Sequence, residues 1–130
     1  MSNYSEKFEK MRVAGKLAAQ TLDMLTDNIK PGVTTEFIDK LGYEFIRDNG
    51  AYSAPLFYRG FKKSLCTSLN HVVCHGIPSD RILNEGDALN VDVTAIIDGH
   101  YGDTSRMFCI GKTPVKVNNL IDATYESMMR

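Results

Sequence analysis

No stretch of the sequence approaches the roughly 18 consecutive apolar residues that a membrane-spanning helix needs. The start of the chain, residues 1–7, also lacks the basic and then apolar layout of a signal peptide. Low-complexity segments and internal repeats of solenoid length are absent as well. These absences exclude a solenoid and predict a cytoplasmic protein with no membrane partner.

Cysteine is scarce and neither sign of charge is in excess. The three cysteines, Cys66, Cys74 and Cys109, form no Cys-x-x-Cys pair, which argues against a disulfide framework and a structural zinc knuckle. The net charge is -1, from 15 basic and 16 acidic residues, and the basic residues are scattered. This excludes a nucleic-acid groove and a polybasic membrane patch. Small polar substrates remain compatible with the composition.

The remaining composition predicts one folded domain, because 130 residues with 43% hydrophobic content are enough for a core. Apolar residues at helical spacing predict a helix over residues 5–28 and a second helix from Thr34 or Thr35 to Asn49-Gly50. The expected buried stripes are Phe8, Met11, Ala14, Leu17, Ala18, Leu22, Leu25 and Ile29 in the first helix, and Phe37, Ile38, Leu41, Phe45 and Ile46 in the second.

Strands are expected after the two helices. Residues 64–75 read as a strand that turns at residues 76–78, and a further turn at residues 84–87 leads into a hairpin. A last helix starts at Thr113-Pro114, with Val117, Leu120, Ile121 and Met128 at helical spacing. It has no stop signal before Arg130, so a truncated chain is expected. Helices, strands and another helix predict an α+β fold, with an antiparallel sheet backed by helices.

The hairpin spans Leu89 to Phe108 and turns at Asp98-Gly99, a strong signal for a two-residue loop. Such a loop pairs Thr94 with Asp103, which makes Asp92 a diagonal neighbour of Asp103 on the same face. Diagonal Cα atoms lie roughly 7–8 Å apart, so the two carboxylates are within bridging distance of metal ions. The alternative is an ordinary sheet face wetted by solvent. The opposite face is apolar, through Leu89, Val91, Val93, Ala95 and Ile97.

Three ordered motifs surround these aspartates: Asn70-His-Val-Val-Cys-His-Gly-Ile-Pro78, Val91-Asp-Val-Thr94 and Gly102-Asp-Thr-Ser-Arg-Met-Phe108. Together with the opening helix and the turn at residues 30–34, they closely resemble type I methionine aminopeptidase over essentially the whole chain. The resemblance implies half of the pita-bread (creatinase/aminopeptidase) fold. It also implies metal-assisted removal of initiator methionine from peptide or nascent-protein N-termini that have a small second residue.

The resemblance also implies roles for individual residues. Asp92 and Asp103 are the first two ligands of a site for two divalent ions, with Co, Mn, Fe, Zn and Ni as candidates. His75 is the catalytic imidazole that contacts the substrate. Tyr58, Phe61 and Cys66 would form the apolar pocket for the methionine side chain, with core packing as the alternative reading.

The chain departs from the family pattern in two ways. Arg59 stands where many relatives carry histidine, and Pro55 stands where some have cysteine. The remaining family ligands, one histidine and two glutamates, belong to a half that would follow Arg130. Residues 1–130 are therefore expected to be the N-terminal portion of one catalytic domain.

Two alternatives to an active methionine aminopeptidase stay open. One is an inactive fragment or interaction module of the same fold, and the other is a proline-specific metallopeptidase of that fold. The full-length enzyme is expected to be a monomer working near ribosomes, without direct nucleic-acid binding, and the fragment alone is expected to self-associate.

Overall fold

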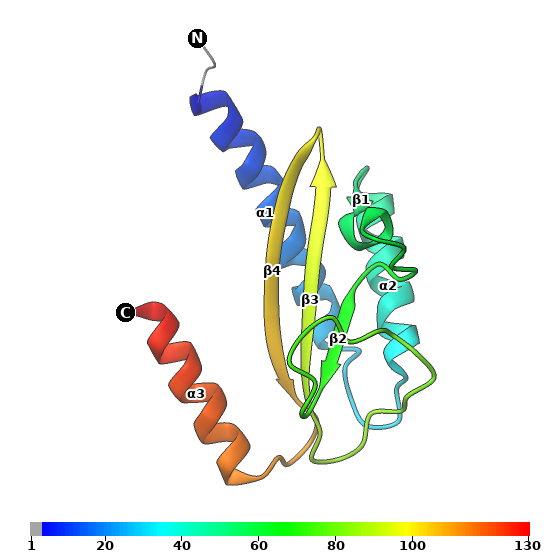
Figure 1. Cartoon of the computed structure of the whole chain (residues 1–130), viewed down its shortest axis with the longest axis vertical. Helices are drawn as coiled ribbons and strands as arrows, with labels where there is room; N and C mark the ends of the chain where they lie inside the picture. The colour runs from blue at the N-terminus through cyan, green and yellow to red at the C-terminus, as the bar shows by residue number, and fades with distance from the viewer. Residues whose placement is uncertain (1–3) are drawn as a thin grey trace.

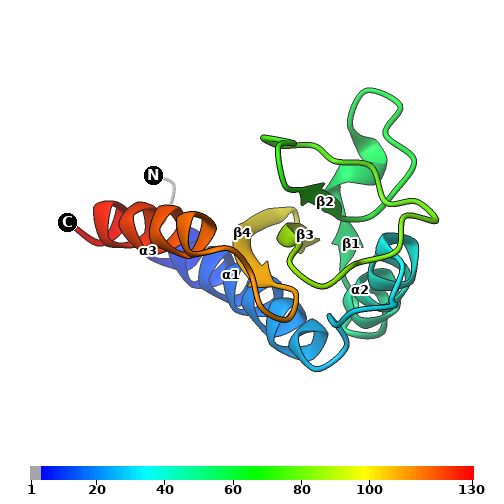
Figure 2. The ribbon, with the colours of Figure 1, turned by 90° about the horizontal axis from the view of Figure 1, so that it is seen from below.

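The computed structural model describes residues 4–130, and Figure 1 shows an antiparallel sheet with helices against it. Figure 2 shows α1 and α2 on one side of the sheet, while loops rise from the other. The elements in chain order are α1 (Tyr4–Thr26), α2 (Thr35–Asp48), β1 (Tyr52–Ser53), the 3-10 helix η1 (Ala54–Phe57), β2 (Cys66–Leu69), β3 (Ala88–Ile97), β4 (His100–Cys109) and α3 (Val115–Met129). The predicted α+β fold class is confirmed.

Strand β3 is the centre of the sheet. One edge pairs with β4 along its whole length, and the other pairs with β2 and then β1, all antiparallel. The predicted two-residue turn is confirmed, because Asp98 and Gly99 have φ of 48° and 73°, as a type I′ turn requires. Thr94 consequently lies opposite Asp103, in the expected register.

The core lies between the sheet and helices α1 and α2. Alternate β3 residues, from Leu89 to Ala95, are buried against it, whereas Asp92 and Thr94 are half-buried on the opposite face. This alternation separates a packing face from a face that is free to form a site. The largest fully buried side chains include Leu22, Leu25, Ile38, Ile46, Leu65, Leu83, Leu89, Ile110, Val91 and Val93.

Helix α2 is tied to the start of β2. Thr34 caps the helix, since its hydroxyl oxygen accepts the Phe37 N–H at 3.2 Å. The buried Asp39 carboxylate accepts the Ser64 and Leu65 backbone N–H groups at 2.8 and 2.7 Å. These bonds hold the two residues just before β2 beside the helix.

The predicted strand over residues 64–75 is wrong in its extent. Strand β2 ends at Leu69 because Asn70 turns the chain with φ of 52°. The Asn70 amide donates to Asp87 at 3.0 Å, and its oxygen accepts the Ala88 N–H at 3.0 Å, which holds the turn. The short strand β1 was not predicted from the sequence.

The prediction of burial is also wrong at three positions. Phe8 and Met11 are 53% and 50% exposed, since the buried part of α1 begins at Ala14, where the helix meets the sheet. Phe37 is 44% exposed. Helix α3 forms as predicted, but none of its residues is buried and Leu120 is 69% exposed. Helical spacing was therefore a correct guide to helix formation, and it was a correct guide to burial mainly where α1 and α2 pack in the core.

Candidate metal and substrate site

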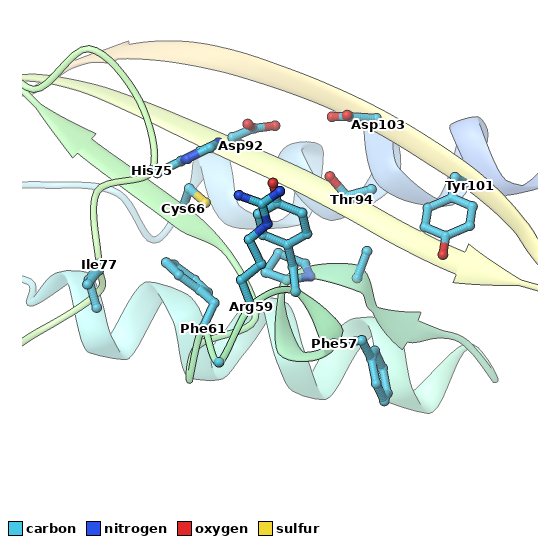
Figure 3. Close-up of a pocket in the computed structure, with 14 residues that line it drawn as sticks. Phe57, Arg59, Phe61, Cys66, His75, Ile77, Asp92, Thr94, Tyr101 and Asp103 are labelled. Carbon is cyan, nitrogen blue, oxygen red and sulfur yellow. The ribbon is translucent and has the colours of Figure 1, made fainter.

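Asp92 on β3 and Asp103 on β4 lie on the same face of the sheet, as predicted. Asp103 pairs with Thr94 across β3 and β4, and Asp92 pairs with Cys66 across β3 and β2. Residues directly opposite one another in an antiparallel pair point to the same side. Figure 3 shows Asp92, Asp103 and Thr94 above the same cavity.

The two carboxylates influence each other's ionisation. The pKa of Asp92 is raised, first because burial penalises its charged form and then because Asp103 is negatively charged and hydrogen-bonds to it. The neighbouring His75 opposes this rise. A cation between the carboxylates would relieve their repulsion, and hard oxygen ligands suit divalent ions. The donor set therefore fits a divalent metal.

These two aspartates do not complete a metal site on their own. Within residues 4–130, no group of three or more His, Cys, Asp or Glu side chains could hold an ion. Any further His, Cys, Asp or Glu ligands would have to come from outside the part of the chain that the structure describes. In that same part, no helix is long and apolar enough to cross a membrane.

His75 is positioned by the glycine that follows it. The Gly76 N–H donates to the Ser68 hydroxyl at 3.1 Å, and the Gly76 carbonyl accepts the Thr67 N–H at 2.8 Å. A Cβ at position 76 would lie 2.2 Å from the Thr67 oxygen, so only glycine permits this approach to β2. His75 itself has φ of 55°, a left-handed conformation that costs energy for residues other than glycine and that clusters at active sites.

One cavity of about 650 Å³ contains all the site residues predicted from the sequence, a size typical of small-ligand pockets. Its polar end holds His75, Asp92 and Asp103. The remaining lining residues are Ala54, Pro55, Phe57, Tyr58, Arg59, Gly60, Phe61, Cys66, Ile77, Thr94 and Tyr101. Phe57 and Tyr101 were not predicted as site residues. Tyr101 could have been found, because it is two residues from Asp103 on the same strand and therefore shares its face.

Cys66 combines pocket lining with burial. Its side chain lines the cavity, yet the residue is only 8% exposed. Burial, followed by the negative charge of Asp92, raises the pKa of its thiol to about 11. The thiol is therefore protonated at neutral pH, which suits a wall residue and not a nucleophile.

Comparison with known proteins assigns the chain to a family. The profile of metallopeptidase family M24 matches residues 9–130. The chain belongs to metallopeptidase family M24. Family membership implies that divalent metal ions are the cofactor, in agreement with the two carboxylates on one face.

Individual M24 relatives are similar over nearly all of this chain. The methionine aminopeptidase of Rickettsia prowazekii is 56% identical over 128 residues, which cover 98% of this chain and 49% of the relative. The crystal structure of methionine aminopeptidase from Rickettsia prowazekii matches with a TM-score of 0.94, covering 96% of this chain and 50% of that one. This M24 chain thus spans about half the length of the curated relatives it matches.

The M24 fold is shared with proline peptidases. The Xaa-Pro dipeptidase from Bacillus anthracis matches with a TM-score of 0.83 at 19% identity, which shows a common fold and nothing more. Together, the matches confirm the expected half of a pita-bread fold.

Proposed function

We propose that this M24 chain is the N-terminal part of a methionine aminopeptidase catalytic domain, which removes initiator methionine before a small second residue. One observation carries the proposal: Asp92, Asp103 and His75 line the same cavity as Tyr58, Phe61 and Cys66. To cleave a peptide after one apolar residue, an enzyme needs hydrolytic groups and an apolar pocket for that residue in the same cavity. The name of the Rickettsia prowazekii relative supports this substrate.

Asp92 and Asp103 are the metal-holding residues in this proposal. Two divalent ions, chosen from Co, Mn, Fe, Zn and Ni, would be held by them together with ligands supplied from outside residues 4–130. When bound, such ions supply a Lewis acid that lowers the pKa of water and stabilises developing negative charge during amide hydrolysis. The carboxylates also offer the peptide's free amino group a negative partner.

His75 and the apolar wall act directly on the peptide. The imidazole lies at the polar end of the cavity, where it can hydrogen-bond to the scissile amide and hold a proton there. Tyr58 and Phe61 offer aromatic surface, which makes favourable contacts with a thioether sulfur. Cys66 closes the pocket with a neutral thiol.

The partners follow from this activity and are part of the same proposal. They are N-termini of peptides and nascent proteins in the cytoplasm, close to ribosomes, and the full-length enzyme is a monomer. Two rivals differ in observable ways. An inactive fragment or interaction module of the same fold would release no methionine, and a proline-specific peptidase would prefer X-Pro peptides. The Cys74-His-Gly-Ile-Pro78 segment favours methionine aminopeptidase.

A fusion protein tests the proposal. The chain is joined to the remaining half of the Rickettsia prowazekii relative, and methionine release from Met-Ala-Ser is compared with cleavage of an X-Pro peptide. Met-Ala-Ser should be cleaved and the X-Pro peptide should not. His75→Ala in the fusion should lower turnover by about 10²-fold or more, while the metal content stays unchanged. Preferential X-Pro cleavage would replace the proposal with the proline-specific rival.

A further inference from the structure

The cavity contains one permanently positive side chain. Arg59 is the only lysine or arginine among the described residues that line it. Its guanidinium lies over the Tyr58 ring, 5.3 Å from the centroid, within the range of a cation–π contact. Figure 3 shows the side chain extending from its loop towards the strands that carry Asp92 and Asp103. The ring therefore gives the guanidinium a preferred position inside the cavity.

Arg59 has no carboxylate partner within residues 4–130. The ion pairs found in that part of the chain all involve other side chains. Guanidinium binds carboxylates through two parallel N–H donors, a geometry that lysine and histidine do not reproduce. Because Arg59 is exposed and unpaired, this donor pair is available to a ligand in the cavity.

Arg59 occupies a turn position whose backbone conformation is unfavourable for arginine. Arg59 and Gly60 have φ of 45° and 77°, and the Phe61 N–H donates to the Tyr58 carbonyl at 2.9 Å. Turns with positive φ at both central positions favour asparagine, aspartate or glycine. A bulky residue in this conformation costs about 1–2 kcal/mol. Strained residues of this kind concentrate at functional sites.

We propose that Arg59 is a specificity residue that binds a carboxylate of the peptide, favouring substrates with an acidic third residue. This inference rests on the proposed function, because it takes the peptide amine to lie at Asp92 and Asp103. With the methionine side chain against Tyr58 and Phe61, an extended peptide advances about 3.3–3.6 Å per residue towards the cavity mouth. Arg59 is exposed and is the only lysine or arginine among the described residues that line this cavity, so its guanidinium would offset the repulsion of an acidic peptide by the two aspartates.

Peptide binding to the fusion protein proposed above, in its His75→Ala form to keep turnover low, tests this inference. Calorimetry with Mn²⁺ present compares amidated Met-Ala-Ser, Met-Ala-Asp and Met-Ala-Lys. Met-Ala-Asp should bind about two- to fivefold more tightly than Met-Ala-Ser, as expected for an exposed ion pair. Met-Ala-Lys should bind more weakly than either. The preference should shrink as salt is added.

Variants at position 59 test whether Arg59 causes the preference for an acidic third residue. Arg59→Gln should abolish it, and Arg59→Glu should reverse it in favour of Met-Ala-Lys. Lys62→Gln is the matched control, because Lys62 is an exposed neighbouring cation that does not line the cavity, and this variant should keep the preference. Met-Ala-Ser with a free terminal carboxylate distinguishes the two sources of the carboxylate. Tighter binding of that peptide alone assigns the recognition to a chain terminus and overturns the third-residue assignment.

The failures of the two proposals are distinguishable. Equal binding of the three amidated peptides, or an unchanged preference in Arg59→Gln, overturns the role of Arg59 and leaves the proposed function standing. If none of the methionyl peptides binds with Mn²⁺ present, the substrate pocket itself is wrong, and both proposals fall.

Discussion

Gly102 of β4 lies against the backbone of Ala14 in α1, so close that a Cβ at position 102 would be 2.1 Å from the Ala14 carbonyl oxygen. Asp103 is the next residue along β4. The contact between helix and strand therefore sets the position of one proposed metal ligand. Any side chain at position 102 has to push the two elements apart.

Gly102→Ala should destabilise the fold by about 1–3 kcal/mol, as overpacking does at rigid contacts. The obstructing atoms belong to the backbone and have no rotamer through which to move away. Urea unfolding measures the loss. Gly15→Ala is the matched control, because a Cβ at position 15 would have nothing within 4 Å and the residue is inside α1. That control should stabilise the helix by roughly 0.5–1 kcal/mol.

Asp103→Asn should have opposite effects with and without metal. In the metal-free chain it removes the charge that raises the pKa of Asp92, so stability at neutral pH should increase. An amide is a weaker ligand for a hard cation, so Mn²⁺ affinity should fall. On one preparation of the variant, urea unfolding measures the metal-free stability and calorimetry measures the Mn²⁺ affinity. A variant that lost stability without metal would show that the two carboxylates do not repel each other in the folded chain.

The pH dependence of the Asp92 contribution has a definite sign. Its pKa is raised on folding, so the folded state holds the proton more tightly than the unfolded state. In the metal-free chain, the Asp92 carboxyl therefore stabilises the fold at low pH, and this stabilisation declines as pH rises through the raised pKa. Asp92→Asn should remove that decline. Urea unfolding of both chains at a series of pH values from about 3 to 7, which spans the ordinary carboxyl pKa range and extends above it, would measure the difference.

Asp87 should contribute to stability with the opposite pH dependence. Burial alone would raise the pKa of its carboxyl, but hydrogen bonds from the Asn70 side chain and the Asn84 N–H, with the charge of Arg81, lower it overall. The stabilisation is present above the ordinary aspartate pKa and is lost as pH falls through the lowered value. Asn70→Ala should reduce stability at neutral pH by about 1–2 kcal/mol, and less below the lowered pKa. An equal loss at both pH values would rule out this charge-dependent contribution.

The 130-residue chain by itself should self-associate and show no enzymatic turnover. No residue of α3 is buried, with Val115, Leu120 and Met128 each about 70% exposed, and β4 pairs within the described chain only through its edge with β3. Exposed apolar surface and open strand edges promote association. Light scattering measures the association, and Met-Ala-Ser with Mn²⁺ measures the activity. A clean monomer releasing methionine at about 1 s⁻¹ or faster would contradict the prediction.

Local patterns were enough to predict the hairpin and the helices. The Asp98-Gly99 loop and the alternation of Leu89 to Ile97 determine the register within a short segment, so the shared face of Asp92 and Asp103 followed from the sequence. Helices α1 and α2 begin and end within about two residues of their predicted limits, because caps and apolar spacing are also local signals. The metal and substrate roles of these residues stay predictions.

Contacts distant in sequence decided the rest. Strand β2 ends early because Asn70 bonds to Asp87 and Ala88, and the Gly76 carbonyl returns to Thr67. The exposure of Phe8, Met11 and α3 depends on how far the sheet extends beneath each helix, which spacing along one segment does not encode. The sequence by itself thus determined which residues share a strand face, and the tertiary structure decided which segments meet, because burial depends on partners that are remote along the chain.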